Sequence, residues 1–275
     1  MTPLLLALGA SLAWGVADFA GPLISRTLGA LRVLFWAQVG GVVALGVVVA
    51  LRGEGPRGAG VLFAIAAGVC GTSGLYAYYR GMQVGAMSVV APIAGVSAVI
   101  PVVYGIATGD SPSAWQIAGV CAALVGVGLA SIEHQEGRRR IATGVGLALL
   151  AALGFGLYFP WMHAAGKVDY WWASLIFRST ALLVVATAVT GARTRLRLRP
   201  RYLMFAAAAG IGDTVGNVLF AASSAHGLVS LTSVLASLYP IVTVLLAAAV
   251  LRERIAPMQR AGVALTLAGV VLIGA

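Results

Sequence analysis

The stretch that decides the fold occurs twice, as QIAGVCAALVGVGL at residues 116–129 and as QRAGVALTLAGVVL at residues 259–272. The two copies lie 143 residues apart and keep the same register, pairing Gln116/Gln259, Gly119/Gly262, Leu124/Leu267, Gly126/Gly269 and Leu129/Leu272. In each copy the two glycines that recur, Gly119 and Gly126 or Gly262 and Gly269, are seven residues apart, so they share one helix face and allow another helix to approach closely. We therefore expect two equivalent helices, packed through small residues.

The composition indicates a membrane protein. The chain is 60% hydrophobic and 9% charged, whereas soluble domains average about 25% charged residues. About 20 apolar residues suffice to cross roughly 30 Å of hydrocarbon as a helix. Ten such segments predict an all-α integral membrane protein with ten transmembrane helices, at approximate borders 3–24, 31–51, 58–80, 86–107, 113–131, 141–164, 170–191, 201–223, 228–250 and 257–274.

The repeat extends over the whole chain, so helices one to five recur as six to ten. Because five is odd, the second copy must enter the membrane in the opposite direction, which predicts the inverted repeats typical of secondary transporters. The expected organisation is a first repeat at 1–132, a polar linker at 133–140 and a second repeat at 141–275. The pairs that support it are Trp14/Phe155, Gly15/Gly156, Gly68/Gly210, Gly74/Gly216, Tyr78/Phe220, Gly85/Gly227, Ser88/Ser230 and Asp110/Glu253.

The net charge of +10 is a property of the loops, so we expect no nucleic-acid partner. Fourteen of the 18 basic residues flank connections that follow odd-numbered helices, including Arg138–Arg140 and RTRLRLRPR at 193–201. Since Lys and Arg favour cytoplasmic loops, the charges predict that both chain ends lie outside. The two cysteines, Cys70 and Cys121, lie in apolar segments and suggest neither a disulfide nor a metal site. No phosphate-binding loop or hydrolase motif is present, so we expect no enzyme, cofactor or metal.

A family resemblance rests on LAWGVADF at 12–19, on SVLASLYPIVTVLLAAAVLRERIAPMQRAG at 233–262 and on the repeat. In these features the chain resembles the drug/metabolite transporter superfamily in its ten-helix EamA-type branch. It implies export of small metabolites, with the YddG-type amino-acid exporters as the nearest kind, and a cavity between helices 1, 3, 4, 6, 8 and 9. It also implies cytoplasmic chain ends, against the charge distribution.

The chain departs from this pattern in its first half. No proline stands at Ser97 or Ala98, the positions that match Pro240, and Gly109–Asp110 replaces the Arg252–Glu253 of the second half. These departures concern the details of the fourth helix rather than the fold.

Three charged residues lie inside apolar segments: Asp18, Arg178 and Asp213. Since a charge at the bilayer centre costs about 2.5–3.5 kcal/mol on insertion scales, each needs a reason. One reason is a substrate or proton site facing the cavity. The other is structural, with Arg178 and Asp213 joined as an ion pair between helices and Asp18 hydrated near a helix end.

Aromatic and small polar residues share helix faces with these charges and predict an aromatic-rich pocket. Two alternatives stay open: Tyr78 and Tyr79 also fit an interfacial belt, and the stripe beginning at Phe155 also fits ordinary packing. Prolines within helices free backbone carbonyls and are hinge candidates, though a static kink is also compatible. The expected substrate-binding residues are Trp14, Asp18, Tyr78, Tyr79, Ser97, Phe155, Tyr158, Phe159, Asp213, Asn217 and Tyr239, and the expected hinges are Pro92, Pro101, Pro160 and Pro240.

The function expected from sequence is therefore secondary transport across the plasma (inner) membrane by alternating access, with hydrophobic or aromatic amino acids as the exported solute. Its partners would be the small solute, membrane lipid and, if Asp18 titrates, protons. A multidrug-type extruder of lipophilic cations is the alternative within transport. A polytopic membrane enzyme would need clustered His, Asp or Glu at one membrane face, and the three histidines are scattered.

Overall fold

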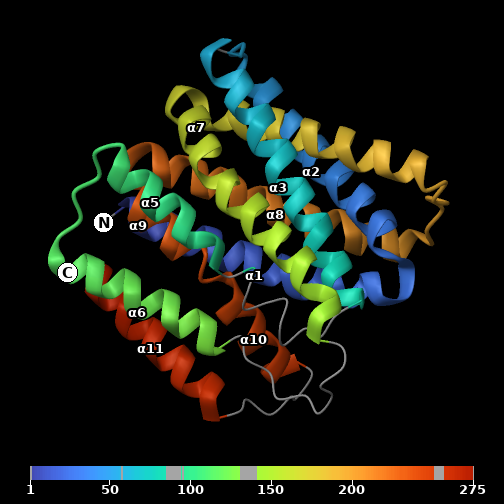
Figure 1. Ribbon diagram of the computed structural model, residues 1–275. Coiled ribbons are helices and arrows are strands. Elements are labelled where there is room, and N and C mark those ends of the chain that lie inside the picture. Colours follow the sequence, from blue (N-terminus) through green and yellow to red (C-terminus); the bar gives the residue numbers. More distant parts are fainter. Residues whose placement is uncertain are drawn as a thin grey trace.

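A computed structural model describes residues 2–56, 58–84, 94, 96–130, 141–250 and 257–274. Within these ranges the regular structure is helical and no strand occurs (Figure 1). The elements are α1 (Thr2–Leu28), α2 (Ala30–Arg52), α3 (Gly58–Val84), η1 (Val96–Ala98), α5 (Val99–Ala107), α6 (Ala114–Ala130), α7 (Ile141–Gly191), α8 (Pro200–His226), α9 (Val229–Ala236), α10 (Tyr239–Val250) and α11 (Pro257–Gly274).

The all-α membrane architecture expected from the sequence is confirmed. Of the described helices, α1, α2, α3, α7 and α8 are long and apolar enough to cross a membrane. The 51-residue α7 contains two of the expected segments, which meet at a kink where Asp169 has non-helical backbone angles. Shorter apolar helical stretches occupy 114–126, 229–243 and 260–273, the second of which includes α9 and the start of α10. Helix α5 lies in the fourth expected segment. Residues 131–140, which contain the expected linker, are outside the described part, so the borders of the two halves stay a prediction.

The ninth expected segment is broken rather than continuous. Helix α9 ends at Ala236 and α10 begins at Tyr239, because Pro240 has no backbone N–H to continue the hydrogen-bond ladder. In the first half, η1 precedes α5 at the positions that align with 238–240. Within the described residues, the first half thus has a 3-10 turn where the second half has its break. Pro101 and Pro160 lie within α5 and α7, Pro92 is outside the described residues, and hinge motion at these prolines stays a prediction.

Helix pairs related by the repeat pack in the same way. The first part of α7 packs along α3, and α1 packs along α8; α5 contacts α9, and α6 contacts α11. Figure 1 shows both chain ends on one side of the bundle and the connection between α7 and α8 on the other. This arrangement is the one expected of two halves related by a twofold axis in the membrane plane.

The repeated glycines form the contact between α6 and α11. A Cβ atom added to Gly119 would lie 2.7 Å from the carbonyl oxygen of Gly269, and one added to Gly269 would lie 2.6 Å from the carbonyl oxygen of Gly119. A Cβ on Gly126 would lie 2.7 Å from the carbonyl oxygen of Gly262. The duplicated stretch therefore serves helix packing, as its spacing predicted.

An ion pair connects the kink in α7 to the end of α2. Asp169 accepts backbone N–H bonds from Trp171 at 2.9 Å and Trp172 at 3.2 Å, which caps the helix that follows the kink. Its carboxylate also pairs with Arg52, with 3.1 Å between Nη1 and Oδ1. The sequence did not predict a role for this aspartate. By capping the second part of α7, it allows two membrane spans to follow each other with almost no loop between them.

We predict that Gly119→Val lowers the thermal unfolding midpoint of the detergent-purified protein, because the branched side chain would overlap the backbone of α11. Overpacking of this kind costs about 1–3 kcal/mol. The matched control is Gly128→Ala in the same helix, where nothing lies within 4 Å of an added Cβ. Equal midpoints for Gly119→Val and the wild type would contradict the packing role.

The basic connection between α7 and α8 predicts membrane orientation. We expect a single cysteine at position 197 to be labelled only by a reagent that reaches the cytoplasmic side, because Lys and Arg favour that side. Labelling from the outside of intact cells would instead support the orientation that the family resemblance implies. A cysteine placed at Lys167, on the opposite side of the bundle, should give the reverse pattern.

Candidate functional site

A central cavity lies where α1, α2, α3, α7, α8, α10 and η1 meet. It spans about 600 Å³ of space free of protein atoms, part of it open to the outside. Most of its wall is apolar and aromatic, with a few charged and polar groups. The lining residues are Trp14, Asp18, Gln38, Gly71, Thr72, Leu75, Ser97, Phe155, Tyr158, Phe159, Phe177, Arg178, Asp213, Asn217 and Tyr239.

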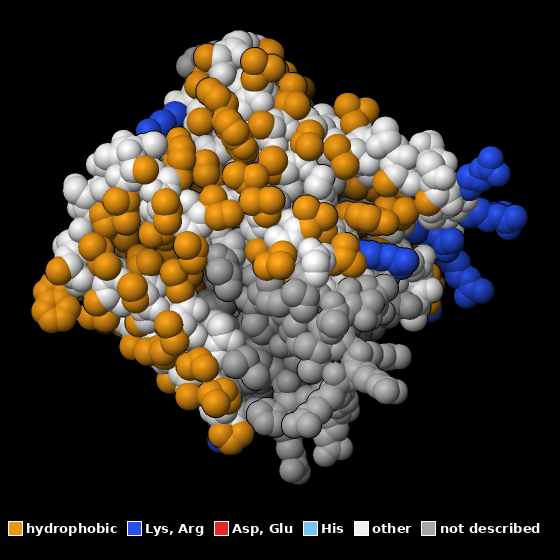
Figure 2. Space-filling view, viewed as in Figure 1, with side chains coloured by type: hydrophobic (Ala, Val, Ile, Leu, Met, Phe, Trp, Pro, Cys, Tyr) orange, Lys and Arg blue, Asp and Glu red, His pale blue; other side chains and the backbone are white. Residues whose placement is uncertain are grey.

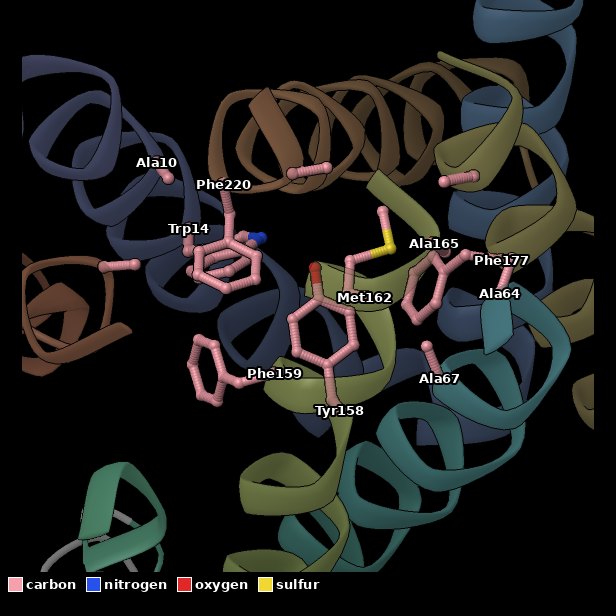
Figure 3. Close-up of a cluster of buried hydrophobic side chains, with 13 residues drawn as sticks. Ala10, Trp14, Ala64, Ala67, Tyr158, Phe159, Met162, Ala165, Phe177 and Phe220 are labelled. Carbon is pink, nitrogen blue, oxygen red and sulfur yellow. The ribbon is translucent and has the colours of Figure 1, made fainter. Parts of the chain in front are cut away.

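Trp14 is the centre of the aromatic wall. Its ring centroid lies 6.0 Å from that of Tyr158, 6.2 Å from Phe159 and 6.3 Å from Tyr239, all in edge-to-face geometry. Behind it, Phe220 is fully buried at 6.0 Å. Figure 3 shows Trp14 beside Phe220, with Tyr158 and Phe159 reaching toward them from α7. Edge-to-face contacts of this kind stabilise a rigid aromatic surface.

A chain of hydrogen bonds joins this wall to α8. The Tyr158 hydroxyl donates to Oδ1 of Asn217 at 2.6 Å. The backbone carbonyl of Asp213 accepts from Nδ2 of Asn217 at 2.7 Å and from Nε1 of Trp14 at 3.2 Å. These bonds satisfy buried polar groups and hold Trp14 and Tyr158 in fixed orientations. The spacing of Asp213 and Asn217, one helical turn apart, predicted that they share a face.

Arg178 and Asp213 form a buried ion pair between α7 and α8. Only 1% of the arginine surface is exposed, while the side chain of Asp213 keeps 28%. Arg178 also donates to Oε1 of Gln38 in α2 at 2.7 Å, so three helices are tied at one guanidinium. An ion pair between helices was one of the two alternatives that the sequence allowed for these two charges. Both groups nevertheless line the cavity.

Asp18 has a different environment. It lies one turn after Trp14 and faces the cavity, yet none of the ion pairs or hydrogen bonds among the described residues includes it. The other carboxylate of the cavity, Asp213, is near enough to interact with it electrostatically. With two carboxylates and one guanidinium, the cavity carries a formal charge of −1 when both acids are ionised. Within the described part of the chain, Asp18 is thus a carboxylate without a cationic partner, inside an aromatic chamber.

The apolar frame of the cavity is built twice. Trp14 contacts Phe220, and their repeat partners Phe155 and Tyr78 also contact each other, at 5.8 Å between centroids. A glycine makes room for each pair: a Cβ on Gly74 would lie 3.1 Å from Cδ1 of Phe155. Its repeat partner Gly216 faces the indole of Trp14 in the same way. Pairs of residues that the sequence repeat aligns are therefore equivalent in three dimensions.

Nine of the eleven residues expected at the site surround this one cavity. The exceptions are Tyr78, which packs behind Phe155, and Tyr79, which packs in a cluster with Leu34 and Val185. Sequence reasoning missed Gln38, Thr72 and Phe177. A glutamine within an otherwise apolar span was the available signal for Gln38, because buried amides need partners. Whether the nine residues bind a solute stays a prediction.

A second, more polar cavity lies between α5, α7 and α8 on the side of the chain ends. It is lined by Tyr104, Asp110, His163, Lys167 and His226 among others. His163 follows Phe159, a wall residue of the central cavity, by one turn of α7. The second cavity therefore lies next to the central one in the direction of the chain ends.

Comparison with known proteins places this geometry in a family. The model of the EamA-like transporter family matches the chain twice, over residues 1–132 and 142–275. No curated protein matches the chain. Among 27 matching chains of solved structures, one described as "Crystal structure of protein" has a TM-score of 0.79. It covers 98% of this chain and 95% of its own length at 16% identity, which shows a shared fold. Since the family model covers almost every residue, this chain belongs to the EamA-like transporter family of multi-pass membrane transporters for small molecules.

Proposed function

We propose that the protein is a secondary transporter for small amine-bearing organic solutes, with amino acids that have apolar or aromatic side chains as the principal cargo. The observation that carries the proposal is the carboxylate of Asp18 inside the aromatic chamber, which has no cationic partner among the described residues. A solute ammonium would pair with this carboxylate and lie near the face of Trp14, where cation–π attraction adds to the ion pair. The apolar part of the solute would fill the space between Phe155 and Phe159.

The repeat and the interrupted helices support alternating access as the mechanism. Inverted halves can exchange conformations about a site at their interface, and the cavity lies between them. Ser97, in the 3-10 turn of the first half, and Tyr239, at the break of the second half, both border the cavity. Local rearrangement at these two places would open one side of the site and close the other.

Proton coupling would use the same carboxylate. A protonated Asp18 no longer attracts an ammonium group, so proton binding and solute binding would compete at one side chain. Exchange of a proton for a cationic or zwitterionic solute then follows from simple electrostatics. If Asp18 stays ionised throughout, transport would follow the solute gradient alone.

A lipophilic-cation extruder is the second candidate, because the formal charge of −1 needs only a cation and not a zwitterion. The candidates differ in whether the solute carboxylate contributes. Thr72 has a buried hydroxyl without a hydrogen-bond partner among the described residues, and it borders the cavity. A small shift would let it donate to a carboxylate, which favours amino acids.

The test is counterflow of radiolabelled amino acids in liposomes that contain the purified protein, with and without a pH gradient. We expect counterflow of phenylalanine and related apolar amino acids, and competition by their decarboxylated amines. Asp18→Asn should reduce the rate at least tenfold and remove any pH-driven component, because a charge-assisted contact contributes about 1.5–3 kcal/mol. Trp14→Ala should also reduce transport.

The control for both variants is Leu12→Ala, since Leu12 lies on the same helix and faces outward. Unchanged counterflow in Asp18→Asn and Trp14→Ala would contradict the proposed site. Inhibition by tetraphenylphosphonium without any amino-acid counterflow would favour the lipophilic-cation alternative.

We predict that Arg178→Met destabilises the protein by about 3 kcal/mol, because it leaves the carboxylate of Asp213 without its buried partner. The double variant Arg178→Met/Asp213→Leu should recover most of this loss, because it leaves no buried charge behind. Thermal unfolding in detergent measures both effects, with exposed Lys167→Met as the control. A double variant as unstable as the single one would show that the ion pair is not the cause.

A further inference from the structure

The connection between α7 and α8 presents a row of arginines on a fixed backbone. After α7 ends at Gly191, the N–H of Arg193 bonds to the Thr190 carbonyl at 3.1 Å and that of Thr194 to the Val189 carbonyl at 3.0 Å. At the other end, Arg199 is the extended N-cap of α8, and Pro200 starts the helix. Both ends of the connection are therefore held by ordinary helix-terminal geometry.

Exposure alternates along the connection. Arg193, Arg195, Arg197 and Arg199 are exposed, whereas Thr194, Leu196 and Leu198 are half-buried. An extended chain places alternate side chains on opposite sides, so every second residue, an arginine, points outward. The inner side is anchored, because Leu196 packs against Leu34 and Val185, and its carbonyl accepts a 2.8 Å bond from Nε1 of Trp36.

The arginines have no acidic partner within the described part of the chain. The ion pairs found there involve Arg52 and Arg178, which lie elsewhere. Arg201 continues the row at the start of α8, and its guanidinium lies 4.5 Å from the centroid of the Tyr202 ring. Five guanidinium groups thus share one edge of the molecule, where Figure 2 shows Lys and Arg side chains gathered.

This edge borders exposed apolar side chains. Met204 and Phe205, one turn into α8, are exposed, as is Leu183 in α7. In a bilayer, side chains at this level meet the hydrocarbon, and the preceding residues meet the headgroups. The arginine row is therefore at the depth of lipid phosphates.

We propose that the row formed by Arg193, Arg195, Arg197, Arg199 and Arg201 is a binding site for anionic phospholipid headgroups. Guanidinium groups form paired hydrogen bonds with phosphate oxygens, and juxtamembrane basic groups attract anionic lipids. The anchored backbone keeps the arginines displayed before a lipid arrives, which lowers the ordering cost of binding. Because Trp36 fastens the row to α2, bound lipid would brace α2, α7 and α8 at this side. This proposal does not depend on which solute is transported.

The test is native mass spectrometry of the detergent-purified full-length protein after incubation with equal amounts of phosphatidylglycerol and phosphatidylcholine. We expect retention to favour phosphatidylglycerol. The variant Arg195→Gln/Arg197→Gln/Arg199→Gln should lower this preference at least tenfold, and Arg197→Gln alone should lower it measurably. The triple lysine variant should keep an intermediate preference, since it retains charge but loses the paired geometry.

Lys167→Gln is the control, because it removes an exposed charge on the opposite side of the bundle. Since the altered side chains are exposed, all variants should unfold at the wild-type temperature without added lipid. Inorganic phosphate in excess should not displace the lipid, which separates a headgroup site from a site for free anions. An unchanged preference in both the triple glutamine and the single variants, no preference in the wild type, or an equal loss in Lys167→Gln would overturn the proposal.

Discussion

Close approach of helix backbones is the constraint on which the rest of this structure depends. Between lipid tails there is little hydrophobic drive to bring helices together, so packing must come from contact itself. Here glycines provide that contact: Gly119 and Gly269 at α6 and α11, and Gly74 and Gly154 at α3 and α7, where an added Cβ on Gly154 would lie 2.7 Å from Cα of Gly74. Such contacts bring the helices near enough to enclose a cavity walled by side chains.

The two halves supply the same frame but different chemistry. Trp14 with Phe220 and Phe155 with Tyr78 are equivalent pairs, each beside an equivalent glycine. The two carboxylates of the cavity and the amide of Asn217 have no equivalent polar group in the other half. By the register of the repeat, Asp18 aligns with Phe159, Asp213 with Gly71 and Asn217 with Leu75. The apolar frame is thus twofold symmetric. Each carboxylate and the Asn217 amide, in contrast, has an apolar residue at the equivalent position of the other half, so these polar groups of the cavity are not symmetric.

Much of this arrangement could be predicted from sequence because membrane proteins encode it in simple patterns. Apolar segment length predicted the helices, and glycine spacing predicted the contact of α6 with α11. Helical periodicity placed Trp14 with Asp18 and Asp213 with Asn217. The apolar frame could be predicted because it is repeated, so that the pattern in each copy supports the prediction made from the other.

The remaining features depend on contacts between distant segments, which spacing does not reveal. The sequence predicted the Arg178–Asp213 ion pair as one of two alternatives, and the packing of α7 against α8 shows that it forms. The bond from Arg178 to Gln38 required knowing how α2 and α7 cross. Tyr78 and Tyr79 are adjacent and both pack in the cluster with Leu34 and Val185, yet only Tyr78 also contacts Phe155 of the cavity wall. The sequence did not predict that two membrane spans follow each other almost without a loop at Asp169, because an aspartate that caps a helix cannot be told from a loop residue by sequence alone.

The account centres on a solute that lies between Trp14 and Phe155 with its ammonium at Asp18. The most direct measurement is a crystal structure grown with 4-bromophenylalanine, with anomalous scattering used to locate the bromine. The account predicts one bromine peak inside the central cavity, at the aromatic wall, with density for the amino group next to the Asp18 carboxylate. A bromine peak only outside this cavity, or an amino group paired elsewhere while Asp18 faces no ligand, would contradict it.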